Sequence, residues 1–366
     1  MISLFKPNMN FEEIEALSSV IYSKWLGLGP KVKEFETKFG NYVGRDYPIG
    51  LNSGTSALHL ALILSGVKEK DEVIVPAITF VSTAHVVKYC GATPVFCDVI
   101  PGPVPNLNLN SVPSLLTDKT KAIIPVHYGG HLIEISFLRN LLPKEVKIIE
   151  DCAHASGTKK AGLIGDFSCF SFQAIKNLSC GDGGMLFCSN QESYERAKQL
   201  RWLGIDKGTW ERGKNNNQYL WEYDVKEIGY KYHMNDIQAA LGIIQLKKLE
   251  KANKYRSYLA SRYIEELKDI SEIVLPPFSE NCSWHIFSVL AQERDSLLNF
   301  LSSNGISCGV HYKPLPLHSC YKSSGSFPVA EKSFRSLLSL PMGPHITVQD
   351  FQKVCSSIGR FYGYNL

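Results

Sequence analysis

Apolar side chains recur at helical spacing near the start of the chain. Asn10 and Glu13 form the pattern of a capping box, and apolar residues then follow every three or four positions as far as Ile21. The stretch after "LGLGP" repeats this spacing between Val32 and Phe39. The pattern therefore predicts two amphipathic helices at the beginning of the chain.

Between residues 45 and 190 the pattern changes to short apolar runs. Examples are "EVIVP", "PVFCDV", "KAIIPV" and "VKIIE", and the segments between them are long enough for helices. Short apolar strands that alternate with helices are typical of an α/β domain with a mostly parallel sheet.

The rest of the chain has a different organisation. The segment "MNDIQAALGIIQLKKLEKANKYRSYLASRYIEEL" is strongly helical, and shorter apolar runs alternate with helical segments after it. We expect an α/β fold with a large domain over residues 1–254, the N-terminal helices included. A smaller C-terminal α+β domain is expected over residues 255–366.

A long polar segment with several aromatic side chains separates the α/β region from the long helix. It covers residues 203–228 and is too long for an ordinary connection. It is also too aromatic for a disordered linker. We interpret it as a functional or interface loop, and expect Trp210 and Trp221 to be protected by a second subunit or by a ligand.

Composition and charge exclude several classes of partner. The 39 basic and 35 acidic residues are interspersed and give a net charge of +4, without the basic stripe that nucleic acid or an anionic membrane would require. No run of eighteen apolar residues and no leader pattern is visible, and the ten cysteines form no C-x-x-C pair. We therefore expect a soluble cytoplasmic protein with reduced thiols.

The segment "IGLNSGTSALHLALILSG" predicts a strand, a tight turn and a helix. The amides at the start of such a helix would point at the turn and could hold a phosphate group. The alternative is plain capping of the helix by Ser53 or Thr55. The segment alone does not decide between them.

The segment "VKIIEDCAHASG" places Asp151 at the end of an expected buried strand, where open α/β sheets hold ligands. An acid at this position favours a cationic partner, although a helix cap or a structural ion pair is an alternative. A metal site could recruit the nearby Cys152, His154, His127 and His131. Their spacings match no closed site of sulfur and nitrogen ligands, so we expect no metal.

Lys176 stands between the apolar run "FSCFSFQAI" and the turn sequence "GDGG". Burial disfavours the ammonium form, so a buried lysine is ready to attack a carbonyl group. The alternative is a lysine that extends into solvent. A phosphate cradle, a strand-end acid and a buried lysine together would suit the phosphate, ring nitrogen and aldehyde of pyridoxal 5'-phosphate.

Six motifs carry a resemblance to a known family: "NSGTSALHLAL", "PAITFVSTAHVVKYCGATPVFCDV", "EDCAHASG", "FSFQAIKNLSCGDGGM", "GYKYHMNDIQAALG" and "GVHYKPLPLH". In this order the chain resembles the DegT/DnrJ/EryC1/StrS family of pyridoxal-phosphate-dependent sugar aminotransferases. The resemblance implies the aspartate aminotransferase fold class, fold type I. It also implies a homodimer whose active sites are shared between the two subunits.

The resemblance assigns roles to residues of the large domain. Lys176 matches the lysine that binds the cofactor covalently, and Asp151 matches the partner of the pyridine nitrogen. His154 falls where the family has a histidine or glutamine near the 3-hydroxyl. Phe80 matches the aromatic residue that stacks on the ring, for which a core phenylalanine is the alternative.

The phosphate contacts of the family match Gly54, Thr55 and Ser171. Lys231 stands where many members have an asparagine that reaches the phosphate site of the neighbouring subunit. A lysine also suits a phosphate, as a point charge, so this departure changes the expected chemistry little.

Three residues of "GVHYKPLPLH" resemble a substrate-binding segment of the small domain: His311, Tyr312 and His318. A structural role for each is an equal alternative. A sister branch of the family that removes sugar hydroxyl groups has histidine in place of the cofactor-binding lysine, so Lys176 favours amino transfer.

The resemblance implies transfer of an amino group, with glutamate as the expected donor, to a nucleotide-linked keto-deoxy sugar used for a glycan or glycosylated product. The alternatives are a sugar dehydratase, a transaminase of another polyol ketone, and a non-catalytic, ligand-sensing member of the fold. Every cofactor motif is intact, and no DNA-binding segment is visible.

Overall fold

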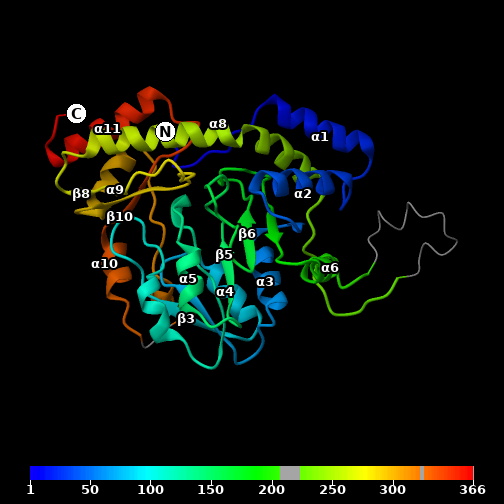
Figure 1. The fold of residues 1–366 in the computed structure, drawn as a ribbon. Helices are drawn as coiled ribbons and strands as arrows, with labels where there is room; N and C mark the ends of the chain where they lie inside the picture. The colour runs from blue at the N-terminus through cyan, green and yellow to red at the C-terminus, as the bar shows by residue number, and fades with distance from the viewer. Residues whose placement is uncertain (207–222, 322–324, 366) are drawn as a thin grey trace.

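The computed structural model describes residues 1–206, 223–321 and 325–365. Within these residues the chain forms a seven-stranded sheet and a three-stranded sheet, each with helices packed on it (Figure 1). Most of the predicted loop over residues 203–228, including Trp210 and Trp221, lies outside the described residues.

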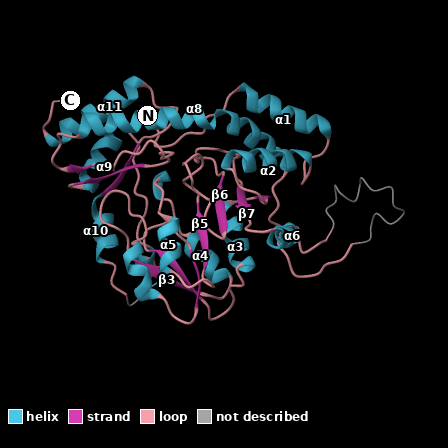
Figure 2. Ribbon diagram, viewed as in Figure 1, coloured by secondary structure: helices cyan, strands magenta, loops and turns pink. Residues whose placement is uncertain are grey.

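The large sheet is mostly parallel, as predicted, and lies among helices in the interior of its domain (Figure 2). In spatial order its strands are β1 (Pro48–Leu51), β7 (Gly184–Phe187), β6 (Phe167–Ser171), β5 (Lys147–Asp151), β4 (Thr120–Ile123), β2 (Glu72–Pro76) and β3 (Thr93–Cys97). Strand β7 is antiparallel to both of its neighbours, and the other neighbouring pairs are parallel.

Helices cover both faces of this sheet because its strands are apolar on both sides. Ile149 of β5 packs in the cluster formed with α3 (Gly54–Leu64), α4 (Ser82–Tyr89) and α6 (Gln191–Leu200). Its neighbour Ile148 points to the opposite face and packs in the cluster of α5 (Ile135–Leu141). On that second face, α2 (Pro30–Val43) and α8 (Asp236–Leu267) cover β6 and β7.

The smaller sheet is antiparallel, with the order β10 (Leu337–Leu340), β9 (Phe287–Ala291) and β8 (Ile273–Val274). The other helices of this region are α9 (Arg294–Ser303), α10 (Pro328–Ser336) and α11 (Val348–Tyr362). Four short 3-10 helices are also described: η1 (Leu109–Leu115), η2 (Tyr128–Gly130), η3 (Leu315–Leu317) and η4 (Ser319–Tyr321).

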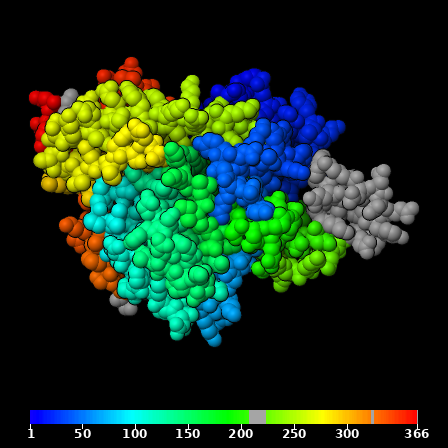
Figure 3. All heavy atoms as spheres, viewed as in Figure 1, coloured from blue at the N-terminus to red at the C-terminus, as the bar shows by residue number. Residues whose placement is uncertain are grey.

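Helix α8 joins the two parts of the molecule, which pack together in the space-filling view (Figure 3). Its second half contributes Leu259 and Tyr263 to the core of the smaller domain, and the N-terminal Ile2 lies in the same core. The helix continues without a break across residue 254. The boundary between domains 1–254 and 255–366 therefore stays a prediction that falls within a helix.

Helix α1 (Phe11–Ser23) begins with the predicted capping box of Asn10 and Glu13. Val20 of this helix is buried, but other apolar residues do not face the chain's own core: Phe11 is 67% exposed and Ile21 is 63% exposed, whereas Glu13 is buried. Glu13 is buried because it forms an ion pair with Lys248 of α8 at 2.8 Å. No helix in the described residues is long and apolar enough to cross a lipid bilayer.

Candidate active site

Asp151 is the last residue of β5 and lies at the carboxyl edge of the parallel strands. It is buried, with 4% of its surface exposed. Its Oδ2 accepts a hydrogen bond from the Thr83 hydroxyl at 3.0 Å, and its Oδ1 accepts one from the Ala153 amide at 3.0 Å. These two donors fix the orientation of the carboxyl group.

The environment of Asp151 suits a cation. Burial raises the pKa of the Asp151 carboxyl, while the hydrogen bonds from Ala153 and Thr83 and the charge of Lys176 lower it. A carboxylate without its hydration shell is stabilised most by a positive charge that binds directly to it. The site therefore favours a ligand with a protonated nitrogen at this position.

Lys176 lies in a turn after β6, where its amide donates to the Gln173 carbonyl at 2.8 Å. Part of the residue stays accessible to solvent. Burial nevertheless lowers the pKa of its amine to about 8, and the nearby Asp151 opposes this shift. Because the pKa lies well below the ordinary 10.5, more of the amine is unprotonated at neutral pH, and only that form attacks a carbonyl.

His154 is a buried, neutral ring with its proton on a defined nitrogen. The Gly129 amide donates to Nδ1 at 3.3 Å, so Nε2 carries the proton and donates to the Tyr312 hydroxyl at 3.1 Å. Burial and the charge of Lys176 keep the pKa of His154 well below its ordinary value. The ring can thus donate a hydrogen bond without becoming charged.

Phe80 and Tyr312 lie together at the same site. Phe80 is 54% exposed, so it is not the core phenylalanine that the sequence left as an alternative. Its ring centroid is 5.9 Å from that of Tyr312, and the Tyr312 ring stacks on His154 at 6.1 Å. The structure therefore brings residues of the large and small domains next to one another.

The beginning of α3 forms the predicted turn. Ser53 caps this helix by accepting a hydrogen bond from the Ser56 amide at 3.1 Å. The amides of Gly54 and Thr55 precede the first intrahelical hydrogen bond, as in any helix start, and remain available for an acceptor. A Cβ atom at Gly54 would lie 2.9 Å from the Cβ of Ser171, so only glycine allows this close contact.

Lys231 occupies an exposed position beside this turn. Its carbonyl accepts a hydrogen bond from the Asn52 side chain at 3.2 Å. Its amine lies 3.6 Å from the centre of the Trp202 ring, in a cation–π contact. Within one chain the Lys231 side chain thus faces Trp202.

The three predicted residues of the small domain differ in placement. His311 joins the site, because its ring centroid lies 5.0 Å from that of Tyr312. Its Nδ1 bonds the Ser339 hydroxyl at 2.9 Å, and burial and the charge of Lys176 lower its pKa to about 4. Tyr312 joins it through His154. For His318 the described contacts are backbone ones, including donation by its amide to the Leu315 carbonyl at 3.0 Å.

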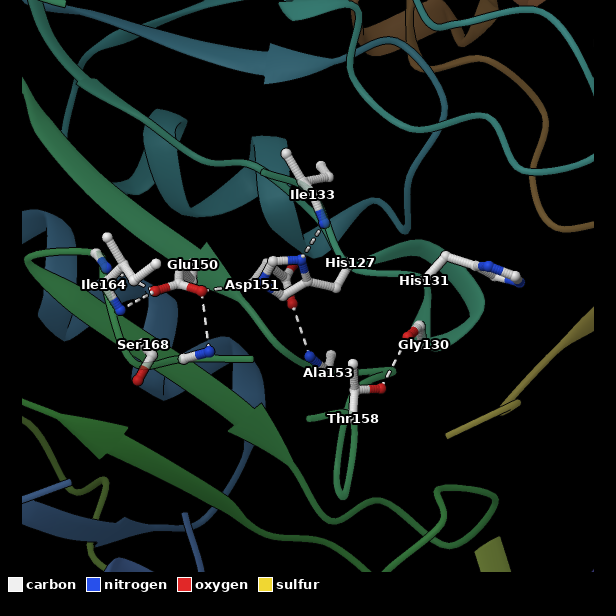
Figure 4. A network of polar contacts seen from close by, with 12 residues as sticks. His127, Gly130, His131, Ile133, Glu150, Asp151, Ala153, Thr158, Ile164 and Ser168 are labelled. Atoms are coloured by element: carbon white, nitrogen blue, oxygen red, sulfur yellow. Dashed lines mark hydrogen bonds and ion pairs between the residues drawn. The ribbon is translucent and has the colours of Figure 1, made fainter. Parts of the chain in front are cut away.

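His127 and Glu150, near Asp151, form a hydrogen-bonded network (Figure 4). His127 and Glu150 are joined at 2.9 Å through Nε2, and His127 Nδ1 accepts from the Ile133 amide at 3.1 Å. Glu150 also accepts from three backbone amides, those of Gly162, Ile164 and Gly165. Cys152 completes a possible ligand group, but these hydrogen bonds already use the lone pairs that a metal would need.

Residues 7–359 match the DegT/DnrJ/EryC1/StrS aminotransferase family. The chain belongs to this family. A protein of Methanocaldococcus jannaschii, MJ1066, is 38% identical over 99% of this chain and 97% of its own length. The spore coat polysaccharide biosynthesis protein SpsC of Bacillus subtilis is 34% identical over 96% and 95% of the two chains.

Solved structures of the family show the same fold, an α/β transferase of fold type I. The sugar aminotransferase Spr1654 of Streptococcus pneumoniae, described as putative, superposes in its PMP form with a TM-score of 0.92. It is 28% identical and covers 99% of both chains, and a PLP form is also known. The family and these structures imply pyridoxal phosphate as the cofactor of this class of aminotransferase.

The site fits this cofactor. The open backbone at Gly54 and Thr55 would hold the phosphate, the buried Asp151 carboxylate would hold the ring nitrogen, and the Lys176 amine would bind the aldehyde. Phe80 offers an exposed aromatic face. The deciding feature is that no backbone acceptor is described for the amides of Gly54 and Thr55, while Gly54 lies close to Ser171 because it has no Cβ atom.

Sequence reasoning missed Thr83, Asn177 and His285. Thr83 is 68 residues from Asp151, and no spacing rule connects the two. Asn177 follows Lys176 directly in the sequence, and this position could have identified it as a residue of the site. Its Oδ1 bonds His285 Nδ1 at 3.1 Å, and the His285 ring centroid lies 4.7 Å from that of His154.

Proposed function

We propose that this family aminotransferase moves an amino group from glutamate to the keto group of a nucleotide-linked deoxy sugar. The observation that carries the proposal is the pairing of Lys176, whose pKa is about 8, with the buried carboxyl of Asp151. A reactive amine and a buried acid at one sheet edge are the two groups that this chemistry requires.

When bound, pyridoxal phosphate carries the amino group and accepts the electrons of the bond that breaks. Lys176 then acts as the proton carrier of the site. Its neutral amine takes a proton from the carbon of the donor that carries the amino group. When the sugar is aminated, the ammonium form of Lys176 gives a proton to the carbon that receives the amino group. A lysine with an unshifted pKa would be a far poorer base at neutral pH.

Asp151 and His154 hold the ligand in an orientation that favours this proton transfer. The Asp151 carboxylate, fixed by Thr83 and Ala153, keeps a ring nitrogen protonated. His154 donates its Nε2 proton to the Tyr312 hydroxyl and so fixes this side chain beside the same space. Neither residue needs to move for these contacts, which is the basis of electrostatic preorganisation.

A sugar acceptor is supported by the relatives. SpsC is described as a spore coat polysaccharide biosynthesis protein, and Spr1654 as a putative sugar aminotransferase. The lysine at position 176 supports amino transfer over dehydration. The nucleotide, the sugar and glutamate as donor belong to the proposal and are open to direct test.

The proposal predicts ping-pong kinetics with glutamate and a nucleotide keto sugar. Purified protein should convert glutamate to 2-oxoglutarate in a single half-reaction, and the aminated protein should then aminate one member of a panel of nucleotide-linked keto-deoxy sugars. Mass spectrometry of the sugar product measures the replacement of a carbonyl oxygen by an amine. Loss of a hydroxyl group without gain of nitrogen would instead identify a dehydratase.

We further propose that the protein is a cytoplasmic homodimer with shared active sites. All ten cysteines are free, as in a reducing compartment. The exposed apolar residues of α1, among them Phe11, Ile14 and Ile21, suit burial against a second subunit. Lys231 is exposed, and the family resemblance supports a contact of its amine with the phosphate of the partner's site.

Mixing two inactive variants tests the shared site. Lys176→Ala and Lys231→Glu should each be inactive alone, but subunit exchange should restore roughly a quarter of the wild-type sites, because each mixed dimer has one intact site. Activity is measured after exchange has been verified with differently tagged chains. If Lys231 serves its own chain, every site keeps one defect and the exchanged mixture stays inactive.

A further inference from the structure

Arg256 is a buried cation without a partner. It lies in α8, the helix that runs along both domains (Figure 1), and only 5% of its surface is exposed. Its nitrogens Nε and Nη1 are buried and have no hydrogen-bond acceptor among the described residues. An unpaired buried guanidinium is strongly unfavourable, so its retention indicates an acceptor that the chain does not itself provide.

The other two buried arginines of the described residues, Arg201 and Arg294, each form an ion pair, unlike Arg256. Arg201 forms an ion pair with Glu36 and also donates to the Gly50 carbonyl at 3.0 Å. Arg294 forms an ion pair with Asp295 at 2.6 Å. For Arg256, burial lowers the pKa to about 10 and no carboxylate of the described residues offsets it. The group still carries its charge at neutral pH.

The surroundings of Arg256 are closely packed and include a second polar side chain. Gly343 adjoins it, and a Cβ atom there would lie 3.7 Å from Arg256 Nη2 and 2.9 Å from His345 Nδ1. His345 Nδ1 is also buried without a partner in the described chain, although its Nε2 bonds the Ser3 carbonyl at 2.8 Å. The Arg256 guanidinium and the unpaired His345 Nδ1 therefore both lie near Gly343.

A short chain of contacts connects Arg256 to Lys176. Asn253, three residues before Arg256 in α8, accepts a hydrogen bond from Asn177 at 2.9 Å, and Asn177 is the neighbour of Lys176. Asn177 also bonds His285 at 3.1 Å. The pKa of His285 is lowered by burial and by the charges of both Lys176 and Arg256. His285 is thus connected through Asn177 to the segment that carries Lys176.

We propose that Arg256 binds the side-chain carboxylate of a dicarboxylic amino donor whose amine faces Lys176. The inference rests on the proposed function. Asp151 lies near Lys176 and is assigned to the ring nitrogen of the cofactor. Arg256 therefore needs a different anion, and the substrate can supply one. Because the Asn177–Asn253 hydrogen bond connects the helical turn before Arg256 to the neighbour of Lys176, Arg256 suits a carboxylate that extends beyond the reacting carbon. A planar guanidinium binds such a group with two parallel hydrogen bonds.

Binding of glutarate, a dicarboxylate without an amine, tests the site on cofactor-free protein. The melting temperature of the wild type should rise with glutarate concentration and should not respond to uncharged glutaramide. Arg256→Met should lose the response, while Arg262→Met, an exposed position two turns further along α8, should keep it. The melting temperature of Arg256→Met without ligand should equal or exceed that of the wild type, because an unpaired charge is removed.

Donor preference tests the same site on the loaded enzyme. In Arg256→Met the KM for glutamate should rise about 30-fold or more, and the preference for glutamate over alanine should fall by a similar factor. Arg256→Lys should retain part of the preference, and the KM of the acceptor sugar should stay within about 2-fold.

If Arg256→Met binds glutarate as strongly as the wild type, the inference is wrong. The unpaired nitrogens of Arg256 would then be explained by bound water alone. If the wild type transfers no amine but binds glutarate through Arg256, the proposed function fails and the carboxylate site stands. If the wild type transfers amine and Arg256→Met keeps its KM for glutamate, the function stands and the inference fails.

Discussion

Lys176→Ala should abolish amino transfer, with kcat reduced by about 10⁴-fold or more, because it removes the amine that we propose binds the cofactor and carries the proton. The alanine leaves the fold intact, since Lys176 lies in a turn and no described side-chain hydrogen bond depends on its amine. Steady-state kinetics with glutamate and the acceptor sugar measure the loss.

A matched control is Lys159→Ala. Lys159 is exposed, and the hydrogen bond given for it is made by its backbone amide, which alanine retains. This variant should keep wild-type turnover. If Lys176→Ala retained more than a small fraction of activity while remaining folded, another base would have to carry the proton, and the assignment of Lys176 would be wrong.

Asp151→Asn should lower kcat by about 100-fold or more while leaving the fold unchanged. The asparagine has nearly the same shape, and its carbonyl oxygen can still accept a hydrogen bond from Thr83 or Ala153. It cannot supply the negative charge that keeps the ring nitrogen protonated. The same kinetic assay, together with the visible absorption of the bound cofactor, separates loss of chemistry from loss of binding.

Asp182→Asn is the control for this variant. Asp182 is exposed in the nearby "GDGG" turn. Its replacement by asparagine removes one negative charge, as Asp151→Asn does, but from an exposed position. It should have little effect on turnover. Near-normal turnover of Asp151→Asn would show that the buried acid is structural and that its hydrogen bonds, not its charge, account for its presence.

Much of the large domain could be predicted because its signals are local. Alternating apolar runs and helices specify parallel strands, and the strand ends place Asp151 and the turn before Gly54 at one edge of the sheet. The outward direction of the α1 apolar residues could not be predicted in the same way. Periodicity shows that a helix has an apolar side, but not whether its own chain covers that side.

The contacts that complete the site could not be predicted because they join distant segments. The hydrogen bond between Tyr312 and His154 spans 158 residues, and that between Thr83 and Asp151 spans 68. His127 was a possible metal ligand in the sequence, because spacing does not reveal that its ring nitrogens bond Glu150 and the Ile133 amide. Arg256 has an unremarkable helical context, and only its burial without a partner sets it apart.

Borohydride reduction followed by peptide mapping tests the assignment of Lys176 most directly. Borohydride reduces the carbon–nitrogen double bond between a lysine and pyridoxal phosphate to a stable single bond. The pyridoxyl group then stays attached to that lysine. We predict that purified, yellow protein loses its colour and carries the label on the peptide that contains Lys176. A label on a different lysine, or an active protein that takes no label, would contradict the assignment.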